Sequence, residues 1–226
     1  MRLNAFLAKA GITSRRGADE FIKTGRIQVN NKPGQLNSEV TETDIVKVDG
    51  KIVKLQQNRY ILLYKPADYV TTLKDEKGRR KVTDLIDIPE RVVPVGRLDY
   101  DTTGVLLLTN DGELAHKLMH PSFEIDKIYE AEVTGNIDKK ILDLLSNSIQ
   151  LEDGPTAPAR ARKLADNKIE LTIREGRKHQ VKRMLTAVGL KVQNLHRSKY
   201  GPIDLAGLKP GQWRDLTPEE VAKLKH

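Results

Sequence analysis

The chain has 226 residues, of which 39 are lysine or arginine and 31 are aspartate or glutamate, so its formal net charge is +8. A hydrophobic fraction of 38% beside a charged fraction of 31% is typical of a soluble globular protein rather than a disordered one. The basic excess favours a polyanionic partner over a neutral metabolite. Because the chain contains no cysteine, disulfides, thiolate metal sites and a thiol nucleophile are excluded.

The N-terminal sequence MRLNAFLAK reaches Lys9 before a secretory apolar region could form, and no later apolar run approaches the length that crosses a membrane. We therefore expect a cytoplasmic protein without membrane association. The sequence has no coiled-coil pattern and no extended apolar surface pattern, so we expect a monomer.

The N-terminal segment predicts a compact helix–helix–sheet module over residues 1–49. Apolar residues from Leu3 to Ala10 recur at helical spacing, and Ser14 can cap a second helix that stops at Gly25. Short alternating runs and turn residues then predict strands. Residues 50–58 are polar without firm periodicity and are expected to be a linker.

This module carries about half of the net charge, because residues 1–58 contain ten basic and six acidic residues. The basic residues around the second predicted helix and its exit are Arg15, Arg16, Lys23, Arg26 and Lys32. They can form one cationic face for phosphates, or simply a solvated helix face. Their charge alone leaves both interpretations open.

From Arg59 onward the pattern predicts an α+β domain that extends to residue 226. Alternating and apolar runs predict strands over 60–64, 92–95, 105–109, 128–134 and 169–173. Helical periodicity predicts helices over 111–119, 138–146, 177–188 and 218–224, the last with a capping box of Thr217 and Glu220.

A charged segment, GRLDYDTTG, separates two apolar runs at residues 96–104. If residues 95–99 are extended, Arg97 and Asp99 lie on the same side of the strand and share one polar surface. The adjacent cation favours an ionised carboxylate, so Asp99 could act as a nucleophile or a base. The alternative is a turn aspartate bonded to its own backbone. Asp101 and its neighbours make only a weak metal loop, because further acids are missing.

A second charged segment, REGRKHQVKRM at residues 174–184, contains five lysines and arginines. On a helix that starts near Arg177, Lys182 lies at the edge of the apolar stripe, where its cation can point into a cleft. The alternative is an exposed basic face. His179 has no partner at metal-ligand spacing, and glycine-rich phosphate loops are absent, so a cofactor-free and metal-free reaction fits best.

Three ordered motifs, GRLDYDTTGVLLLTNDGELAHKLMHP, KIYEAEV and EGRKHQVKRMLTAVG, closely resemble the bacterial ribosomal-RNA pseudouridine synthases of the RsuA type. Residues 1–49, with the Ser14-Arg15-Arg16 step, resemble the S4 RNA-binding module of this family. The resemblance implies that residues 59–226 form a catalytic domain with a mixed, mainly antiparallel sheet flanked by helices around a central cleft.

The resemblance also implies roles for single residues. The catalytic aspartate of the family maps onto Asp99, the active-site tyrosine that stacks on the target base onto Tyr129, and the basic residue that pairs with the aspartate onto Lys182. Arg97 is expected to contact RNA around the extracted nucleotide. Further RNA contacts are expected from Lys65, Arg177, Lys178 and Gln180, together with the cationic residues of the N-terminal module.

The implied reaction converts a uridine to pseudouridine without a cofactor, because no atom is added and nothing is oxidised. The motif HQVKRM, with its lysine, and the motif LHR at residues 195–197 resemble members that act on small-subunit (16S) rRNA, so we expect a small-subunit assembly intermediate as partner. The alternatives are the same reaction on large-subunit (23S) rRNA or on transfer RNA, or a non-catalytic RNA-binding or ribosome-assembly protein. One departure from the family is Asp68, which replaces the glycine of a K-P-x-G motif that begins at Lys65.

Overall fold

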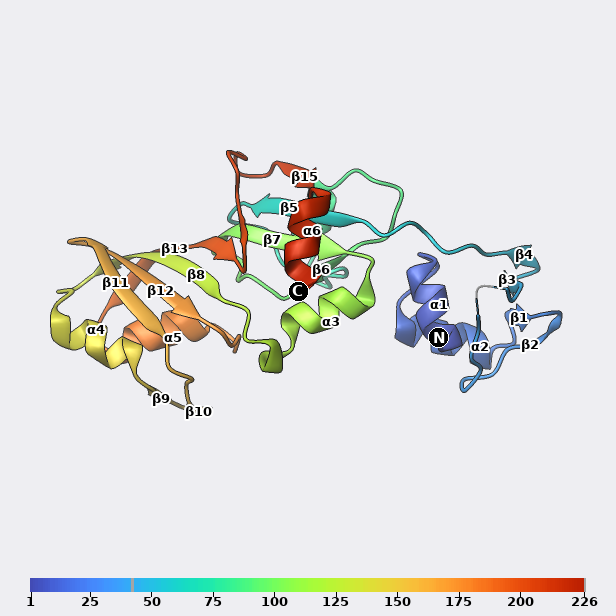
Figure 1. The fold of residues 1–226 in the computed structure, drawn as a ribbon, viewed down its shortest axis with the longest axis horizontal. Coiled ribbons are helices and arrows are strands. Elements are labelled where there is room, and N and C mark those ends of the chain that lie inside the picture. Colours follow the sequence, from blue (N-terminus) through green and yellow to red (C-terminus); the bar gives the residue numbers. More distant parts are fainter. Residues whose placement is uncertain (42, 226) are drawn as a thin grey trace. The chain divides into compact units, whose positions relative to one another are not determined.

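The computed structural model describes residues 1–41 and 43–225. The chain divides into two compact units (Figure 1). The smaller unit contains Met1–Arg59 and two short segments, Ile88–Arg91 and Asn110–Gly112, and the larger unit contains the remainder.

The smaller unit packs two helices against a small sheet with strand order β2-β1-β3-β4. Its elements are α1 (Leu3–Lys9), α2 (Arg15–Lys23), β1 (Ile27–Val29), β2 (Lys32–Pro33), β3 (Val46–Val48) and β4 (Lys51–Ile52). Leu3, Leu7 and Ile27 are fully or almost fully buried in its core. The predicted cap is confirmed, because Ser14 Oγ accepts a hydrogen bond from the Gly17 amide at 3.0 Å.

The boundary of this unit differs from the expected one. A turn at Asp49 and Gly50, both with positive φ, returns the chain as β4, which pairs antiparallel with β3. Val53 and Leu55 then pack against the core. Much of the predicted linker over 50–58 is therefore part of the N-terminal unit.

The larger unit is built on one sheet of nine strands among the described residues. Its strands are β5 (Tyr60–Lys65), β6 (Val93–Val95), β7 (Thr103–Thr109), β8 (Lys127–Thr134), β11 (Arg160–Ala165), β12 (Lys168–Ile173), β13 (Lys191–Tyr200), β14 (Ile203–Asp204) and β15 (Trp213–Asp215). The main path is β11-β12-β8-β13-β7-β5-β15. Only β7 and β13 pair in parallel among these strands, so the expected mixed, mainly antiparallel sheet is confirmed.

The helices α3, α4, α5 and α6 lie against this sheet (Figure 1). The helical and remaining short elements are α3 (Gly112–Met119), α4 (Lys139–Ser146), α5 (Gln180–Ala187), α6 (Pro218–Lys225), the 3-10 turns η1 (Val82–Leu85) and η2 (Pro121–Phe123), and the hairpin β9 (Gln150–Leu151) with β10 (Gly154–Pro155). Residues of α3 and α6 share a hydrophobic core with β5 and β7, while α4 contacts β11 and α5 contacts β13. The predicted capping box of α6 is confirmed by reciprocal bonds between Thr217 and Glu220.

The central strand β13 was not anticipated by the sequence, and neither was β11. The β13 sequence KVQNLHRSKY is mostly polar, and its register against β8 shifts between Val192 and Asn194 and again between Arg197 and Lys199. Such bulges interrupt the alternation by which a strand is recognised.

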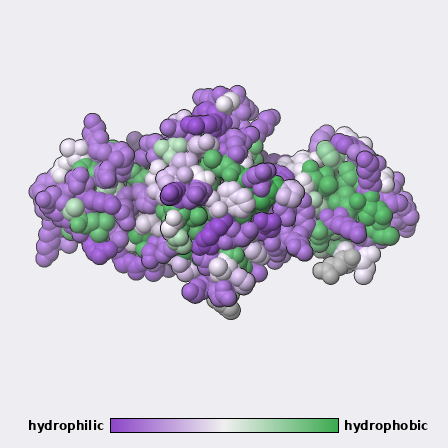
Figure 2. Space-filling model, turned by 90° about the horizontal axis from the view of Figure 1, so that it is seen from above, coloured by the Kyte–Doolittle hydropathy of each residue, from purple (hydrophilic) through white to green (hydrophobic). Residues whose placement is uncertain are grey.

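Hydrophilic residues cover most of the face in Figure 2, and hydrophobic residues gather on the surface of the N-terminal unit. The large exposed hydrophobic residues of that unit are Met1, Ile12, Leu36, Ile45 and Ile52. None of the helices in the described residues is long and apolar enough to cross a bilayer.

Candidate active site

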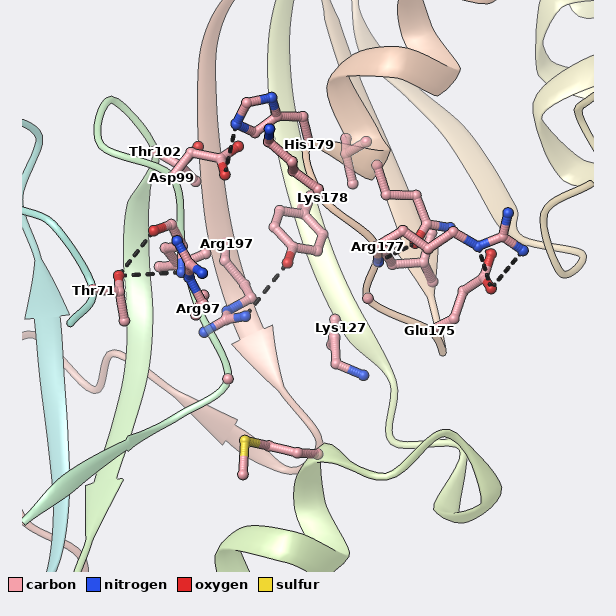
Figure 3. A pocket seen from close by; sticks show the side chains of 18 of the residues that line it. Thr71, Arg97, Asp99, Thr102, Lys127, Glu175, Arg177, Lys178, His179 and Arg197 are labelled. Atoms are coloured by element: carbon pink, nitrogen blue, oxygen red, sulfur yellow. Dashed lines mark hydrogen bonds and ion pairs between the residues drawn. The ribbon is translucent and has the colours of Figure 1, made fainter. Parts of the chain in front are cut away.

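The larger unit contains a cavity of about 870 Å³. Its wall comes from the loop after β6, from β8 and β13 of the sheet, and from the segment that leads into α5. In Figure 3, Asp99, Lys178 and His179 lie near one another at one end of the cavity, and Arg97 and Arg197 lie beside them. The motifs that the sequence singled out therefore meet at one place.

Backbone contacts hold the loop that carries Asp99. Gly96, with φ of +75°, directly follows β6, and the buried Leu98 anchors the loop. The Thr71 hydroxyl donates to the Leu98 carbonyl at 2.8 Å and accepts from the Leu98 amide at 3.3 Å. These bonds leave the Asp99 carboxylate free to face the cavity.

Lys65 secures the other side of this loop, which corrects its expected role. The side chain is fully buried, and its ammonium donates to the carbonyls of Pro66, Tyr100 and Thr102. Burial lowers the pKa of Lys65 to about 8, although nearby carboxylates oppose this shift. A lysine enclosed in this way does not contact RNA; it holds the backbone that follows Asp99.

Asp68, which stands where the resembled family has a glycine, adopts a backbone conformation that favours glycine. Its φ of +64° lies in the left-handed region, which aspartate tolerates better than most residues. The Asp68 amide also donates to the Tyr100 carbonyl at 2.9 Å, so it supports the same loop as Lys65.

Side chains from α5 and its cap lie beside the Asp99 carboxylate. The Lys182 Nζ lies 3.7 Å from Oδ2 of Asp99, and His179 Nε2 lies 3.5 Å from Oδ1. The closer partner of Lys182 is Asp101, at 2.6 Å. Burial would raise the pKa of Asp101, but the hydrogen bond and charge of Lys182 outweigh it, so the pKa is lowered. Lys182 thus interacts with two carboxylates, whereas the sequence predicted only its pairing with Asp99.

Tyr129 projects from β8 into the cavity wall and is 8% exposed. Its hydroxyl accepts a hydrogen bond from Arg197 Nη1 at 3.4 Å. Lys127, two residues earlier on β8, is also buried in this wall and donates to the carbonyls of Ile125 and Arg174. Burial, followed by the charge of Arg197, lowers the pKa of Lys127 to about 8.

The predicted RNA-contacting residues of this unit divide into two groups. Arg97 and Lys178 are exposed at the cavity, and neither makes a hydrogen bond or ion pair within the described part of the chain. Gln180 is 3% exposed and lines the cavity, and its side-chain amide accepts a hydrogen bond from the Arg177 backbone amide and donates one to Glu175. The Arg177 guanidinium donates to the Gly154 and Pro155 carbonyls, so it holds the β9–β10 hairpin instead of pointing free.

The five residues of the N-terminal unit that were predicted to contact RNA are all exposed, namely Arg15, Arg16, Lys23, Arg26 and Lys32. Arg26 is occupied, because it pairs with Asp49 at 2.5 Å and stacks on Phe21 with Cζ 3.8 Å from the ring centroid. Arg15, Arg16, Lys23 and Lys32 have no such partner among residues 1–41 and 43–225. Arg15 and Arg16 form the first turn of α2, where the helix dipole disfavours cations and favours anions. This placement suits contact with phosphates.

Sequence reasoning missed three residues of the cavity wall, namely Lys127, His179 and Arg197, as members of the site. Lys127 stands in the KIYEAEV motif and Arg197 in LHR, so both belonged to recognised motifs without an assigned role. Their burial could not be inferred, because lysine and arginine are seldom enclosed. His179 has no partner at metal-ligand spacing in the sequence, and in the structure its side chain contacts Asp99.

The chain matches two known protein families. The S4 domain model matches residues 1–46, and the model described as RNA pseudouridylate synthase matches residues 59–187. Fold, cavity and matched regions together define a two-part RNA-modifying enzyme, in which an RNA-binding module precedes an isomerase domain. The chain belongs to the RNA pseudouridylate synthase family.

Relatives match along nearly the whole chain. The ribosomal large subunit pseudouridine synthase B of Bacillus subtilis is 48% identical over 99% of this chain and 95% of its own length. An uncharacterized RNA pseudouridine synthase of Aquifex aeolicus is also 48% identical, over 99% and 93%. A crystal structure of a pseudouridylate synthase superposes with a TM-score of 0.74 at 32% identity and covers 99% of both chains.

Proposed function

We propose that this protein converts a uridine of ribosomal RNA to pseudouridine, with Asp99 as the residue that acts on the nucleotide. The observation that carries the proposal is the convergence of Asp99, Lys182 and Tyr129, from three separate motifs, on one cavity or its rim. The competing function, a non-catalytic RNA-binding protein, does not require these three groups to be brought together.

The reaction breaks the bond between N1 and ribose C1′ and forms a bond between C5 and C1′. The C5 proton leaves and N1 gains a proton, so atoms and electrons balance without a cofactor. Arg97 and Lys178 would hold phosphates while the uridine leaves its stack, which costs about a few kcal/mol. Tyr129 would stack on the ring, and the ammonium of Lys182 would lie beside the Asp99 carboxylate.

For the substrate, we favour large-subunit rRNA. The Bacillus subtilis relative named for that subunit aligns with 99% of this chain. Small-subunit rRNA is the second candidate, supported by the HQVKRM and LHR motifs, and the expectation of a small-subunit assembly intermediate depends on it. Either substrate fits a cytoplasmic protein, and the monomer stays a prediction.

The test measures tritium release from C5-labelled uracil in unmodified large-subunit and small-subunit rRNA, followed by mapping of the new pseudouridine. The wild type should release tritium from one uridine of one subunit. Asp99→Asn should stop release while RNA binding persists. Asp166→Asn, at a fully exposed turn outside the cavity wall, is the matched control and should remain active. Undiminished turnover by Asp99→Asn would remove Asp99 from its role.

A further inference from the structure

A buried arginine in the cavity wall has no role in the reaction as described so far. Arg197 is only 2% exposed, and its Nε donates to the Val105 carbonyl at 2.8 Å. Its Nη1 donates to the Tyr129 hydroxyl, and its buried Nη2 has no acceptor among the described residues. Enclosing a guanidinium without a carboxylate partner costs free energy, so a purely structural role explains this placement poorly.

The backbone around Arg197 is shaped to hold it in this position. β7 and β13 pair in parallel at Gly104 and Arg197, and a Cβ on Gly104 would lie 2.2 Å from the Arg197 carbonyl oxygen. Only glycine permits this approach, at its φ of +115°. The register shift between Arg197 and Lys199 against β8 adds a bulge, a feature that re-aims side chains.

Two aromatic rings lie near the guanidinium. Its Cζ lies 5.0 Å from the ring centroid of Tyr200 and 5.9 Å from that of Tyr129. The Tyr200 hydroxyl donates to the Leu118 carbonyl at 2.6 Å, so it is already occupied. Of the two rings, only that of Tyr129 is bonded to the guanidinium through its hydroxyl.

This bond has a consequence for the Tyr129 hydroxyl. Its oxygen accepts from Arg197, so its own hydrogen must be donated elsewhere, and no acceptor for it is present in the described part of the chain. Tyr129 lines the cavity, and a uridine placed there offers carbonyl and ribose oxygens as acceptors.

We propose that Arg197 is a positioning residue of the isomerisation, which holds the Tyr129 ring and directs its hydroxyl hydrogen to the substrate. This inference rests on the proposed function, because it assigns a partner to the tyrosine of that same site. It predicts that Arg197 and the Tyr129 hydroxyl act as one unit.

The test is a double-mutant cycle in single-turnover pseudouridine formation at saturating rRNA, with Arg197→Met, Arg197→Lys and Tyr129→Phe. Arg197→Lys keeps the buried cation, but one amine cannot reproduce the two-armed contact with Val105 and Tyr129. Each single variant should slow the step on the order of tenfold to a hundredfold with KM little changed. In the Tyr129→Phe background, neither Arg197 variant should slow it further.

Arg214→Met is the matched control, because it removes an arginine that is paired with Glu220 and lies outside the cavity wall. Three results would each overturn the inference. They are rate losses of the Arg197 and Tyr129 variants that multiply in the double variant, a wild-type rate in Arg197→Lys, and failure of both Arg197 variants to fold. If Tyr129→Phe is too slow to compare, a crystal structure of Arg197→Lys decides: a displaced Tyr129 supports the inference and an unmoved one overturns it. A wild type that forms no pseudouridine would instead overturn the proposed function.

Discussion

At the scale of single residues, the Lys182 ammonium lies near two carboxylates. It is closer to Asp101, for which the sequence predicted no contact with Lys182, than to Asp99. Its Nζ is 2.6 Å from Asp101 and 3.7 Å from Asp99. The bond to Asp101 holds the ammonium in place, while the longer approach to Asp99 leaves that carboxylate room to meet a substrate. Asp101 is thus a support for Lys182, and not only a residue of the loop.

This geometry predicts unequal effects for the two partners. Lys182→Met should lower the single-turnover rate about a hundredfold, because Asp99 loses its nearby cation. Asp101→Asn should lower it less, because the ammonium stays and an amide oxygen can still accept from it. Rates for both variants on the same rRNA check this order. An equal loss in both would mean that orientation by Asp101 matters as much as the charge.

The buried Lys65 makes the free energy of unfolding depend on pH. Its pKa is about 8 in the folded protein, below the ordinary value of 10.5, so between these values the unfolded chain binds more protons. The unfavourable burial of the cation is fully present below pH 8 and is relieved as pH rises. The unfolding free energy of the wild type relative to Lys65→Met should therefore increase from pH 7.5 to pH 10.

Urea unfolding of both proteins at the two pH values measures this difference. Lys127 titrates in the same range but is present in both proteins, so its contribution cancels in the comparison. A difference that stays constant or falls with pH would contradict the burial of a protonated Lys65.

These residues show what the sequence could and could not predict about the site. Asp99, Tyr129 and Lys182 stood in recognisable motifs, and the structure brings them together. Lys65 and Gln180 stood in motifs as well, but a motif does not say whether a polar side chain faces solvent or the backbone of its neighbours. That distinction depends on contacts between segments far apart in the chain.

At the scale of elements, α5 begins from an unusual residue. His179 caps it with φ of 51°, in the left-handed region, and its side chain makes no cap hydrogen bond. The left-handed backbone turns the imidazole toward Asp99, at 3.5 Å, while α5 carries Lys182 toward the same carboxylate. Local strain thus contributes to the arrangement of the site.

We expect His179→Val to be less stable than His179→Asn by about 1–2 kcal/mol, because a branched residue is strained at positive φ and asparagine is not. Urea unfolding measures the difference. The same pair of substitutions at Lys178, which does not have positive φ, is the control and should differ much less. Equal stabilities at position 179 would show that the left-handed cap is not retained in solution.

The elements of regular pattern were predicted within a few residues, as with α4, which was expected over 138–146 and extends over Lys139–Ser146. The strands β11 and β13 were not predicted, and in β13 two bulges interrupt the alternation of the sequence and accompany the buried placement of Arg197. The bulges that made β13 hard to recognise in the sequence therefore include one beside Arg197, a residue of the cavity wall.

At the scale of the whole molecule, the cationic side chains of the two units differ in their burial and in their partners. In the larger unit, several cations are enclosed and bonded within the protein, as Lys65, Lys127 and Arg197 are. In the N-terminal unit, Arg15, Arg16, Lys23 and Lys32 remain exposed and unpaired within the described residues. Exposed cations attract phosphates through the release of counterions, which makes the affinity depend on salt.

Replacing Arg15, Arg16 and Lys23 together with glutamine should therefore weaken rRNA binding and flatten its salt dependence, by about 0.7 in logarithmic slope for each phosphate of single-stranded RNA that is no longer neutralised. The rate of chemistry on bound RNA should change little, since the reacting groups lie in the other unit. Arg26→Gln with Asp49→Asn is the matched control, because it removes a cation that a carboxylate already neutralises. Binding titrations over a range of salt concentrations measure both slopes, and equal slopes for the triple variant and the wild type would show that these three cations do not meet phosphates.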